Sequence, residues 1–312
     1  MGRIATRMNR VFFGVVAATT AVAVTACGSS GGGDESDTAA ATTRTVEHAH
    51  GVAEVPDSPQ RVVVLEPVQL DTTIALGATP VGAAVLSEAT GVPAYLGEEA
   101  AGIETVGTVA EPNVEAIAAL APDLILGTET RHGDLYEQLA GIAPTVFMAS
   151  QADPWQDNVR FVAGVLGKED AAQTLLDDYT ARCEEIATEH RTEGRTAQLI
   201  RPRNDNLTLY GPTSFAGSTL ECAGLTIPPR DWENSISVDL SPELAAEAKA
   251  DLVVVTSAQP DDPATMPAAV TANAQYFPNL HLVDQSYWIT GVGPLGGMTV
   301  LDDLDRILGA EG

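Results

Sequence analysis

Short, continuous aliphatic runs alternate with short helical patterns from residue 61 onward. Runs of this kind are typical of strands that are buried on both faces of a parallel sheet. Four strands are expected, at residues 61–65, 80–85, 122–127 and 145–149. Helices are expected between them, at 70–76, 111–120 and 135–139. The alternation predicts a layered α/β lobe built on a parallel sheet.

The same alternation restarts after Gly194 and predicts a second α/β lobe. Strands are expected at residues 196–201, 206–210 and 251–255, and a helix is expected to end near 220–224. The two lobes are therefore similar in the order of their elements.

One spacing occurs in both halves of the chain. A glutamate just behind a proline precedes, by eight residues, an aspartate that opens an aliphatic run. The two pairs are Glu115 with Asp123 and Glu243 with Asp251. Because self-similarity over a long period indicates a repeated architecture, we expect two related lobes.

Between the lobes, residues 155–192 contain two helical patterns that Gly167 separates. The second runs from about Glu169 to Arg191, which corresponds to about 35 Å at 1.5 Å per residue. Its apolar positions form one stripe along the helix: Ala172, Leu175, Leu176, Tyr179, Cys183 and Ile186. We expect a single long spine helix to join the lobes.

The N-terminus has the pattern of an export signal. Three arginines lie in residues 1–10, and residues 11–26 are uncharged and mostly apolar. The string Val-Thr-Ala-Cys-Gly at 24–28 then resembles a bacterial lipobox. This resemblance implies cleavage after Ala26 and attachment of a lipid to Cys27. The Gly- and Ser-rich stretch that follows is typical of a flexible tether.

The chain is thus expected to have five parts. They are a signal peptide at 1–26, a lipid-tether linker at 27–45, an N-terminal lobe at 46–154, a helical segment with the spine at 155–192 and a C-terminal lobe at 193–312. We expect an exported protein, anchored by lipid to the outer face of the cell membrane of a bacterium, of the high-GC Gram-positive kind.

Two cysteines remain after cleavage, Cys183 and Cys222. One lies on the spine helix, and the other lies near the end of the first helix of the second lobe, which must pack close by. Because an exported chain meets oxidising conditions, these two residues are expected to form a disulfide.

The charge narrows the function classes. The formal net charge is −27, and it becomes −30 after removal of residues 1–26, which carry three arginines and no acids. A basic surface that binds nucleic acid is therefore excluded. No Gly-x-Ser-x-Gly or P-loop motif occurs, so we do not expect an enzyme.

The strings in their order resemble the iron-siderophore, heme and cobalamin branch of the class III substrate-binding proteins of ABC importers. They are E-V-P-D-S-P-Q-R-V-V-V-L (54–65), L-D-T-T-I-A-L-G-A-T-P-V-G (70–82), E-P-N-V-E-A-I-A-A-L-A-P-D-L-I-L (111–126), L-A-G-I-A-P-T-V (139–146), D-N-V-R-F-V-A-G-V-L-G-K-E-D-A-A (157–172) and V-L-D-D-L-D-R-I-L (300–308). The resemblance implies two Rossmann-like lobes joined by one spine helix, with a ligand cleft between them.

The same resemblance implies the partners of the protein, which is expected to be a monomer. An importer with a permease and an ATPase would receive the ligand, and matching glutamates, here Glu115 and Glu243, would dock onto arginines of the permease. We expect no cofactor and no directly bound metal ion; the ligand is a ferric siderophore, in which the chelator holds the iron.

Arginine and aromatic residues are the candidate ligand contacts, because guanidinium groups bind chelate oxygens and rings cover flat ligand surfaces. The candidates are Arg131, Arg201, Arg203, Tyr210, Arg230, Trp232, Tyr287 and Trp288. A neutral trihydroxamate is the expected chelator, and a triply charged catecholate or a carboxylate type stays open.

Other ligands and roles remain as alternatives. Heme or cobalamin could use the same fold, with Tyr210, Tyr287 or Met298 as axial ligands for heme. Zinc or manganese would need several converging histidines and carboxylates, whereas His48 and His50 lie in an unfixed N-terminal stretch and His132 stands alone. The further alternative is an adhesive or structural surface lipoprotein.

Overall fold

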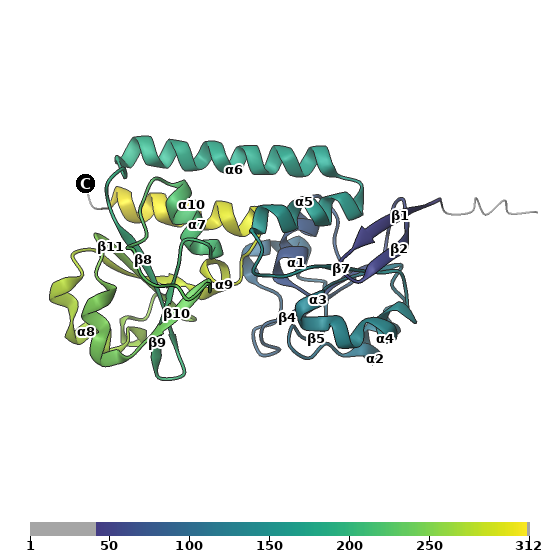
Figure 1. Cartoon of the computed structure of the whole chain (residues 1–312), viewed down its shortest axis with the longest axis horizontal. Coiled ribbons are helices and arrows are strands. Elements are labelled where there is room, and N and C mark those ends of the chain that lie inside the picture. The colour runs from purple at the N-terminus through teal and green to yellow at the C-terminus, as the bar shows by residue number, and fades with distance from the viewer. Residues whose placement is uncertain (1–41, 311–312) are drawn as a thin grey trace, which may run out of the picture. The chain divides into compact units, whose positions relative to one another are not determined.

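The computed structural model describes residues 42–310 and contains two five-stranded sheets (Figure 1). The N-terminal sheet has the order β5-β4-β3-β6-β7, and all four pairings are parallel. Its strands are β3 (Val62–Val64), β4 (Gly82–Val85), β5 (Glu104–Thr108), β6 (Leu124–Thr128) and β7 (Thr145–Met148). The helices of this lobe are α1 (Pro67–Ala75), α2 (Val114–Ala119), α3 (Glu129–His132) and α4 (Tyr136–Ala140). The expected parallel α/β lobe is confirmed.

The C-terminal sheet is mixed, with the order β10-β9-β8-β11-β12. Its strands are β8 (Ala197–Arg203), β9 (Asn206–Tyr210), β10 (Ser237–Leu240), β11 (Leu252–Ser257) and β12 (Leu280–Asp284). Strand β9 is antiparallel to both neighbours, and the other pairings are parallel. The cause is the two-residue turn Asn204–Asp205, where both residues have positive φ and the chain reverses directly. The helices of this lobe are α7 (Phe215–Cys222), η4 (Pro242–Ala248), α8 (Ala268–Ala272), α9 (Gln285–Trp288) and α10 (Pro294–Gly309).

The repeated Glu–Asp spacing occupies equivalent positions in the two sheets. Strands β6 and β11, which the two aspartates precede, hold the same place in the strand order. Asp123 accepts hydrogen bonds from the backbone N–H groups of Gln60 and Arg61 (2.7 and 2.8 Å), and Asp251 accepts one from the N–H of Thr196 (2.8 Å). Each carboxylate therefore fixes the segment that leads into the central strand of its own lobe.

A long helical segment leads from the first sheet to the second (Figure 1). Helix α5 (Trp155–Leu166) ends at Gly167, which adopts the left-handed conformation (φ 66°), and α6 (Glu169–His190) follows. Helix α6 has 22 residues, so it is about 33 Å long. The predicted spine helix is confirmed, and α10 packs against it.

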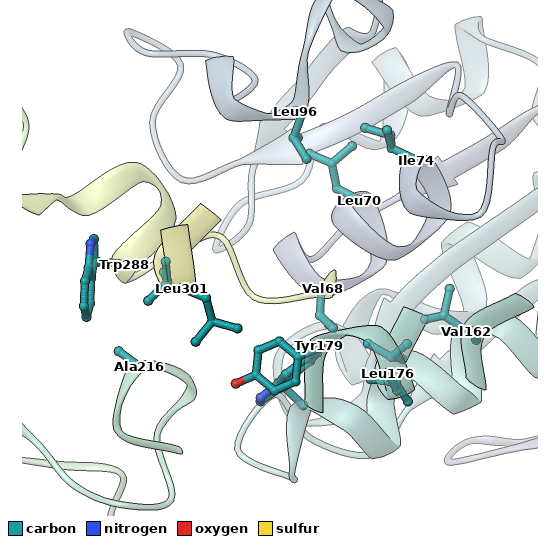
Figure 2. Packing of buried hydrophobic residues seen from close by; sticks show 14 of the residues in the cluster. Val68, Leu70, Ile74, Leu96, Val162, Leu176, Tyr179, Ala216, Trp288 and Leu301 are labelled. Atoms are coloured by element: carbon teal, nitrogen blue, oxygen red, sulfur yellow. The ribbon is translucent and has the colours of Figure 1, made fainter. Parts of the chain in front are cut away.

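One hydrophobic cluster extends through both lobes (Figure 2). It joins Val68 and Ile74 of α1, Tyr179 of α6, and Trp288 and Leu301 from the C-terminal part of the chain. Because interiors of this kind are close-packed, the lobes are expected to move little relative to each other.

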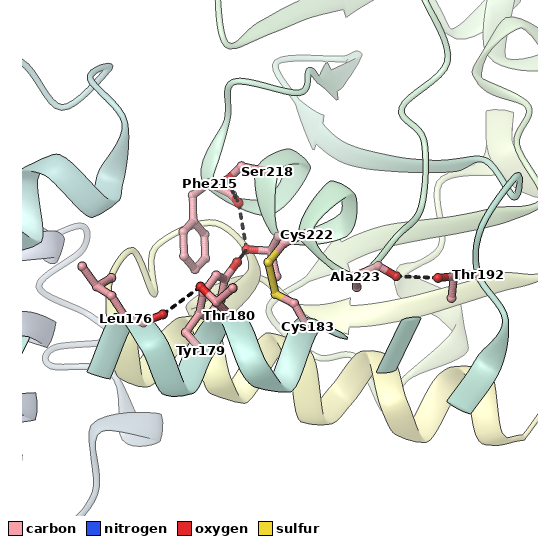
Figure 3. Close-up of a disulfide and its surroundings, with 10 residues drawn as sticks. Leu176, Tyr179, Thr180, Cys183, Thr192, Phe215, Ser218, Cys222 and Ala223 are labelled. Carbon is pink, nitrogen blue, oxygen red and sulfur yellow. Dashed lines mark hydrogen bonds between the residues drawn. A yellow bond between two sulfur atoms is a disulfide. The ribbon is translucent and has the colours of Figure 1, made fainter. Parts of the chain in front are cut away.

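The structure contains the expected disulfide between Cys183 and Cys222 (Figure 3). It joins α6 to the end of α7, with the two Cα atoms 5.4 Å apart. Beside it, the Tyr179 hydroxyl donates to Thr219 Oγ1 (2.9 Å). For a sequence separation of 39 residues, the chain-entropy model gives a stabilisation of about 4 kcal/mol.

An antiparallel hairpin precedes the first lobe, and the sequence did not predict it. Strands β1 (Thr43–His48) and β2 (Gly51–Pro56) pair along their full length, so β1 starts before the expected lobe boundary at residue 46. The expectation of an unfixed stretch around His48 and His50 is wrong. The ring of His50 stacks on Tyr136, with centroids 3.9 Å apart, and its Nδ1 lies 2.8 Å from Glu129.

The signal peptide at 1–26, Cys27 and most of the predicted linker lie outside the described residues. Within residues 42–310, no helix is long and apolar enough to span a bilayer.

Candidate functional site

Two adjoining cavities lie between the lobes. The larger, which we call the arginine cavity, has a volume of about 570 Å³, and the smaller, the side cavity, about 460 Å³. They share Pro67, Leu86, Arg201, Ile289 and Thr290 as lining residues. The linings contain the residues that follow β3, β4, β6, β11 and β12, which is where ligands bind in open α/β sheets.

Five of the eight predicted ligand residues line the arginine cavity: Arg131, Arg201, Arg203, Tyr210 and Trp288. Arg131 lies on α3, directly after β6, whereas Arg201 and Arg203 end β8 and share one face of that strand. Arg201 Nη1 donates to the hydroxyl of Tyr210 (3.3 Å), which orients the guanidinium group. Arginines of both lobes thus reach the same cavity.

Trp288 contributes to the wall only as part of the core. Its side chain is fully buried, and its indole N–H donates to Asp303 (2.8 Å). The structure therefore assigns this tryptophan to packing rather than to an open ligand surface.

The other three predicted residues do not line either cavity. Arg230 donates to the backbone carbonyl of Glu247 (3.0 Å). Trp232 covers Gly211 so closely that a Cβ there would lie 2.8 Å from its ring. Tyr287 donates to Asp303 (3.3 Å). These three residues were predicted from residue type and position in the chain, which do not reveal the groups that bind them in the folded protein.

Glu66 is the buried acid of the arginine cavity. It follows β3, caps no backbone group at the start of α1, and is only 2% exposed. Its Oε1 lies 3.2 Å from Nε of Arg131, but this oxygen has no hydrogen-bond partner among the described residues. Burial raises the pKa of Glu66 to about 7, against the opposing influence of Arg131 and the Thr128 hydroxyl.

His132 holds the turn that carries Arg131. Its Nδ1 accepts from the backbone N–H of Thr128 (3.0 Å), and its Nε2 donates to the carbonyl of Val109 (2.9 Å). Burial lowers the pKa of this imidazole. Because both ring nitrogens are used within the N-terminal lobe, His132 positions its neighbour and does not act as a metal ligand.

Two aromatic residues of the cavity were not predicted. Trp155 is almost fully buried at the start of α5, and its ring contacts Phe215 edge-on, with centroids 5.6 Å apart. Its indole N–H has no hydrogen-bond partner among the described residues. The position of Trp155 shortly after β7, at the carboxyl edge of the sheet, was the signal that could have indicated it.

Among residues 42–310, one cluster has the geometry to hold a metal ion: Glu189, His190 and Asp305. Asp305 already accepts from Arg182 (2.7 Å) and lies 2.5 Å from His190 Nε2. The cluster shares no residue with either cavity.

A sequence profile of the periplasmic binding protein family matches residues 62–276, which include both sheets up to β11 and the spine helix. The chain belongs to this family of periplasmic binding proteins. Proteins of this kind bind a substrate rather than convert it, so the expectation that the chain is not an enzyme is confirmed.

This periplasmic binding protein resembles several relatives. The "probable siderophore-binding lipoprotein YfiY" of Bacillus subtilis is 30% identical over 282 residues, which cover 84% of this chain and 87% of the relative. The Fe(3+) dicitrate-binding periplasmic protein FecB of Escherichia coli is 30% identical over 187 residues, 59% of this chain and 62% of the relative. The structure of Staphylococcus aureus SirA complexed with staphyloferrin B superposes with a TM-score of 0.71 at 26% identity, over 86% of this chain and 99% of SirA.

Proposed function

We propose that this protein captures a ferric siderophore between its two lobes and delivers it to an ABC importer for iron uptake. The observation that carries the proposal is the convergence of Arg131, Arg201 and Arg203 on one cavity in a chain of net charge −27. The relatives described as binding siderophores, ferric citrate and staphyloferrin B support the same reading.

The cavity suits an oxygen-rich chelate. Guanidinium groups donate hydrogen bonds to the oxygens around the iron, and the aromatic walls that Trp155 and Phe215 provide exclude water from the apolar parts of the ligand. A volume of about 570 Å³ lies in the usual range for small-molecule sites. The iron needs no protein ligand in this arrangement, because the chelator holds it.

Titration with a panel of chelates tests the proposal. Trp155 and Trp288 line the cavity and should report binding through their fluorescence. The panel consists of ferric hydroxamates, ferric catecholates, ferric citrate, heme and cobalamin. Saturable binding of at least one ferric siderophore supports the proposal, whereas binding of heme or cobalamin alone, or of nothing, contradicts it.

Removal of either arginine should weaken the binding of that siderophore. Truncation of a guanidinium that makes charge-assisted hydrogen bonds costs about 1.5–3 kcal/mol, so Arg131→Ala and Arg201→Ala should each lower affinity about 10- to 150-fold. The melting temperature of ligand-free Arg201→Ala should hardly change, whereas Arg131→Ala also removes the ion-pair partner of the buried Glu66 and should lower it. Arg160→Ala is the matched control, since Arg160 is half exposed and pairs only locally with Asp157 (2.9 Å). Wild-type affinity in both variants would place the ligand elsewhere.

Delivery requires that the protein stays at the membrane. A lipid on Cys27, behind a signal peptide, would hold the protein at the outer face of the membrane beside the permease. We expect Cys27→Ala to abolish lipidation and membrane attachment, measured as loss of partition into the detergent phase. Full partition of this variant would contradict the anchor.

A further inference from the structure

Two buried polar atoms of the arginine cavity make no well-directed hydrogen bond among the described residues: Glu66 Oε1, which has the ion-pair contact with Arg131 Nε (3.2 Å), and Trp155 Nε1, which can only donate. Leaving a buried polar group unpaired is costly, so such atoms in a cavity indicate a ligand that satisfies them. An acceptor that is 2% exposed calls for an N–H or O–H group on the ligand.

The charges of the cleft point in the same direction. Three arginines line the two cavities, and three acids accompany them: Glu66, Asp153 and Asp284. Arg131 lies against Glu66, so the charge of this arginine is largely compensated within the protein. A ligand with several negative charges therefore meets no clear excess of positive charge in the cleft.

Glu66 is the most buried of the three acids that line the two cavities. Asp153 is exposed, and water screens its charge, whereas the buried carboxylate of Glu66 acts through a medium of lower dielectric constant. The position of Glu66 beside Arg131 places this charge next to the group that would bind chelate oxygens.

We propose that Glu66 is a specificity-determining residue that sets the charge of the chelate accepted by this cavity. This inference rests on the proposed function. Glu66 disfavours triply anionic tricatecholates relative to neutral ferric trihydroxamates, and its Oε1 accepts a hydrogen bond from an N–H or O–H group of the bound complex.

Protonation of Glu66 connects this selection to pH. A highly anionic chelate binds the form in which Glu66 is neutral, so binding takes up a proton. The other charged or titratable groups that line the cavity around Glu66 are Arg131 on α3, Asp153 after β7, Arg201 and Arg203 on β8 and Tyr210 on β9. Because the pKa of Glu66 is raised to about 7 in the ligand-free protein, most molecules carry neutral Glu66 at pH 6 and most carry the carboxylate at pH 8.

The test compares wild type with Glu66→Gln, which keeps the shape and one acceptor oxygen but removes the charge. The probes are ferric enterobactin, a tricatecholate with three negative charges, and ferrichrome, a neutral trihydroxamate. For ferric enterobactin, Glu66→Gln should bind about tenfold more tightly than wild type at pH 8 and about equally at pH 6. For ferrichrome, the substitution should bring no gain at either pH. Asp153→Asn is the matched control, which removes an exposed charge from the same cavity and should have a smaller effect.

The outcomes separate this inference from the proposed function. If wild type binds neither probe nor any other ferric siderophore, the proposed function fails and this inference with it. If chelates bind, but Glu66→Gln changes the affinities for both probes equally or leaves both unchanged, the proposed function stands and the role of Glu66 is overturned. Should Glu66→Gln not fold, the wild-type protein still decides: ferric enterobactin affinity that does not rise from pH 8 to pH 6, relative to ferrichrome, overturns the inference.

Discussion

Iron uptake through the importer is expected to stop when Glu115 and Glu243 are both replaced by lysine, while chelate affinity in solution stays at the wild-type value. Both side chains are exposed. Glu115 lies in the first turn of α2, and Glu243 lies in the first turn of η4. These two helices follow β5 and β10, which are the outermost strands at the same end of the two strand orders. The carboxyl ends of these strands lie at the edge of the sheet that carries the cleft, because β5 is parallel to β4 and β10 runs parallel to β8. We propose that one acid per lobe binds arginines of the permease.

The surface around Glu243 supports this proposal, since the neighbouring Leu244 is 47% exposed and could be covered by a partner. Asp178→Lys combined with Glu184→Lys is the matched control, because it makes the same change of charge on the exposed face of α6. Uptake should be measured with labelled ferric siderophore in cells, and affinity with the purified variants. Normal uptake in the Glu115/Glu243 variant would place docking elsewhere, and loss of chelate binding would indicate a role in folding or in the cleft.

Asp71→Ala is expected to cost about 3 kcal/mol or more of unfolding free energy. Asp71 is completely buried on α1, and it accepts from the backbone N–H groups of Leu295 (2.9 Å) and Gly296 (2.8 Å) at the start of α10. The Tyr95 hydroxyl donates to the same carboxylate (3.0 Å). Alanine leaves three hydrogen-bond donors unpaired in the interior. Each buried donor without an acceptor lowers the free energy of unfolding by about 1–3 kcal/mol.

Urea unfolding of the ligand-free protein at pH 8 measures this cost. Burial raises the pKa of Asp71 to about 7, so at pH 8 the carboxylate is mostly ionised. Asp170→Ala is the control, since Asp170 is an exposed acid in the first turn of α6 and should contribute about 0.3–1 kcal/mol. An equal loss of stability in the two variants would show that the Asp71 contact between α1 and α10 contributes little.

The elements that were predicted from sequence are those whose strands are buried on both faces. Strand β11 is a continuous aliphatic run because helices cover both of its faces, and the stripe on α6 is regular because one side faces the core. Strand β5 (Glu104–Thr108) and the β1–β2 hairpin are partly exposed edges, so polar residues interrupt their pattern. The formation of such strands depends on packing against the strands that pair with them. The local sequence carries no information about these neighbours.

In the candidate site, too, the residues set by local sequence were predicted and those set by tertiary packing were not. Arg131 and Arg201 were predicted because each closely follows a recognisable strand, where the fold class places ligands. Arg230 and Trp288 were chosen by residue type. In the structure, groups of the protein bind both side chains: Arg230 donates to the Glu247 carbonyl, 17 residues away, and Trp288 donates to Asp303, 15 residues away. Glu66 was not predicted as a site residue, since its burial beside Arg131 arises from tertiary packing.

Because one core extends through both lobes, the amount of this protein in the cell is expected to affect the rate of transport. A body that changes shape little presents nearly the same docking face with and without its cargo. Empty copies would then occupy the importer almost as well as loaded ones and would act as competitive inhibitors of transport. The rate of uptake would follow the fraction of copies that carry a chelate rather than their total number, so overproduction of the protein at low siderophore concentration would slow iron import.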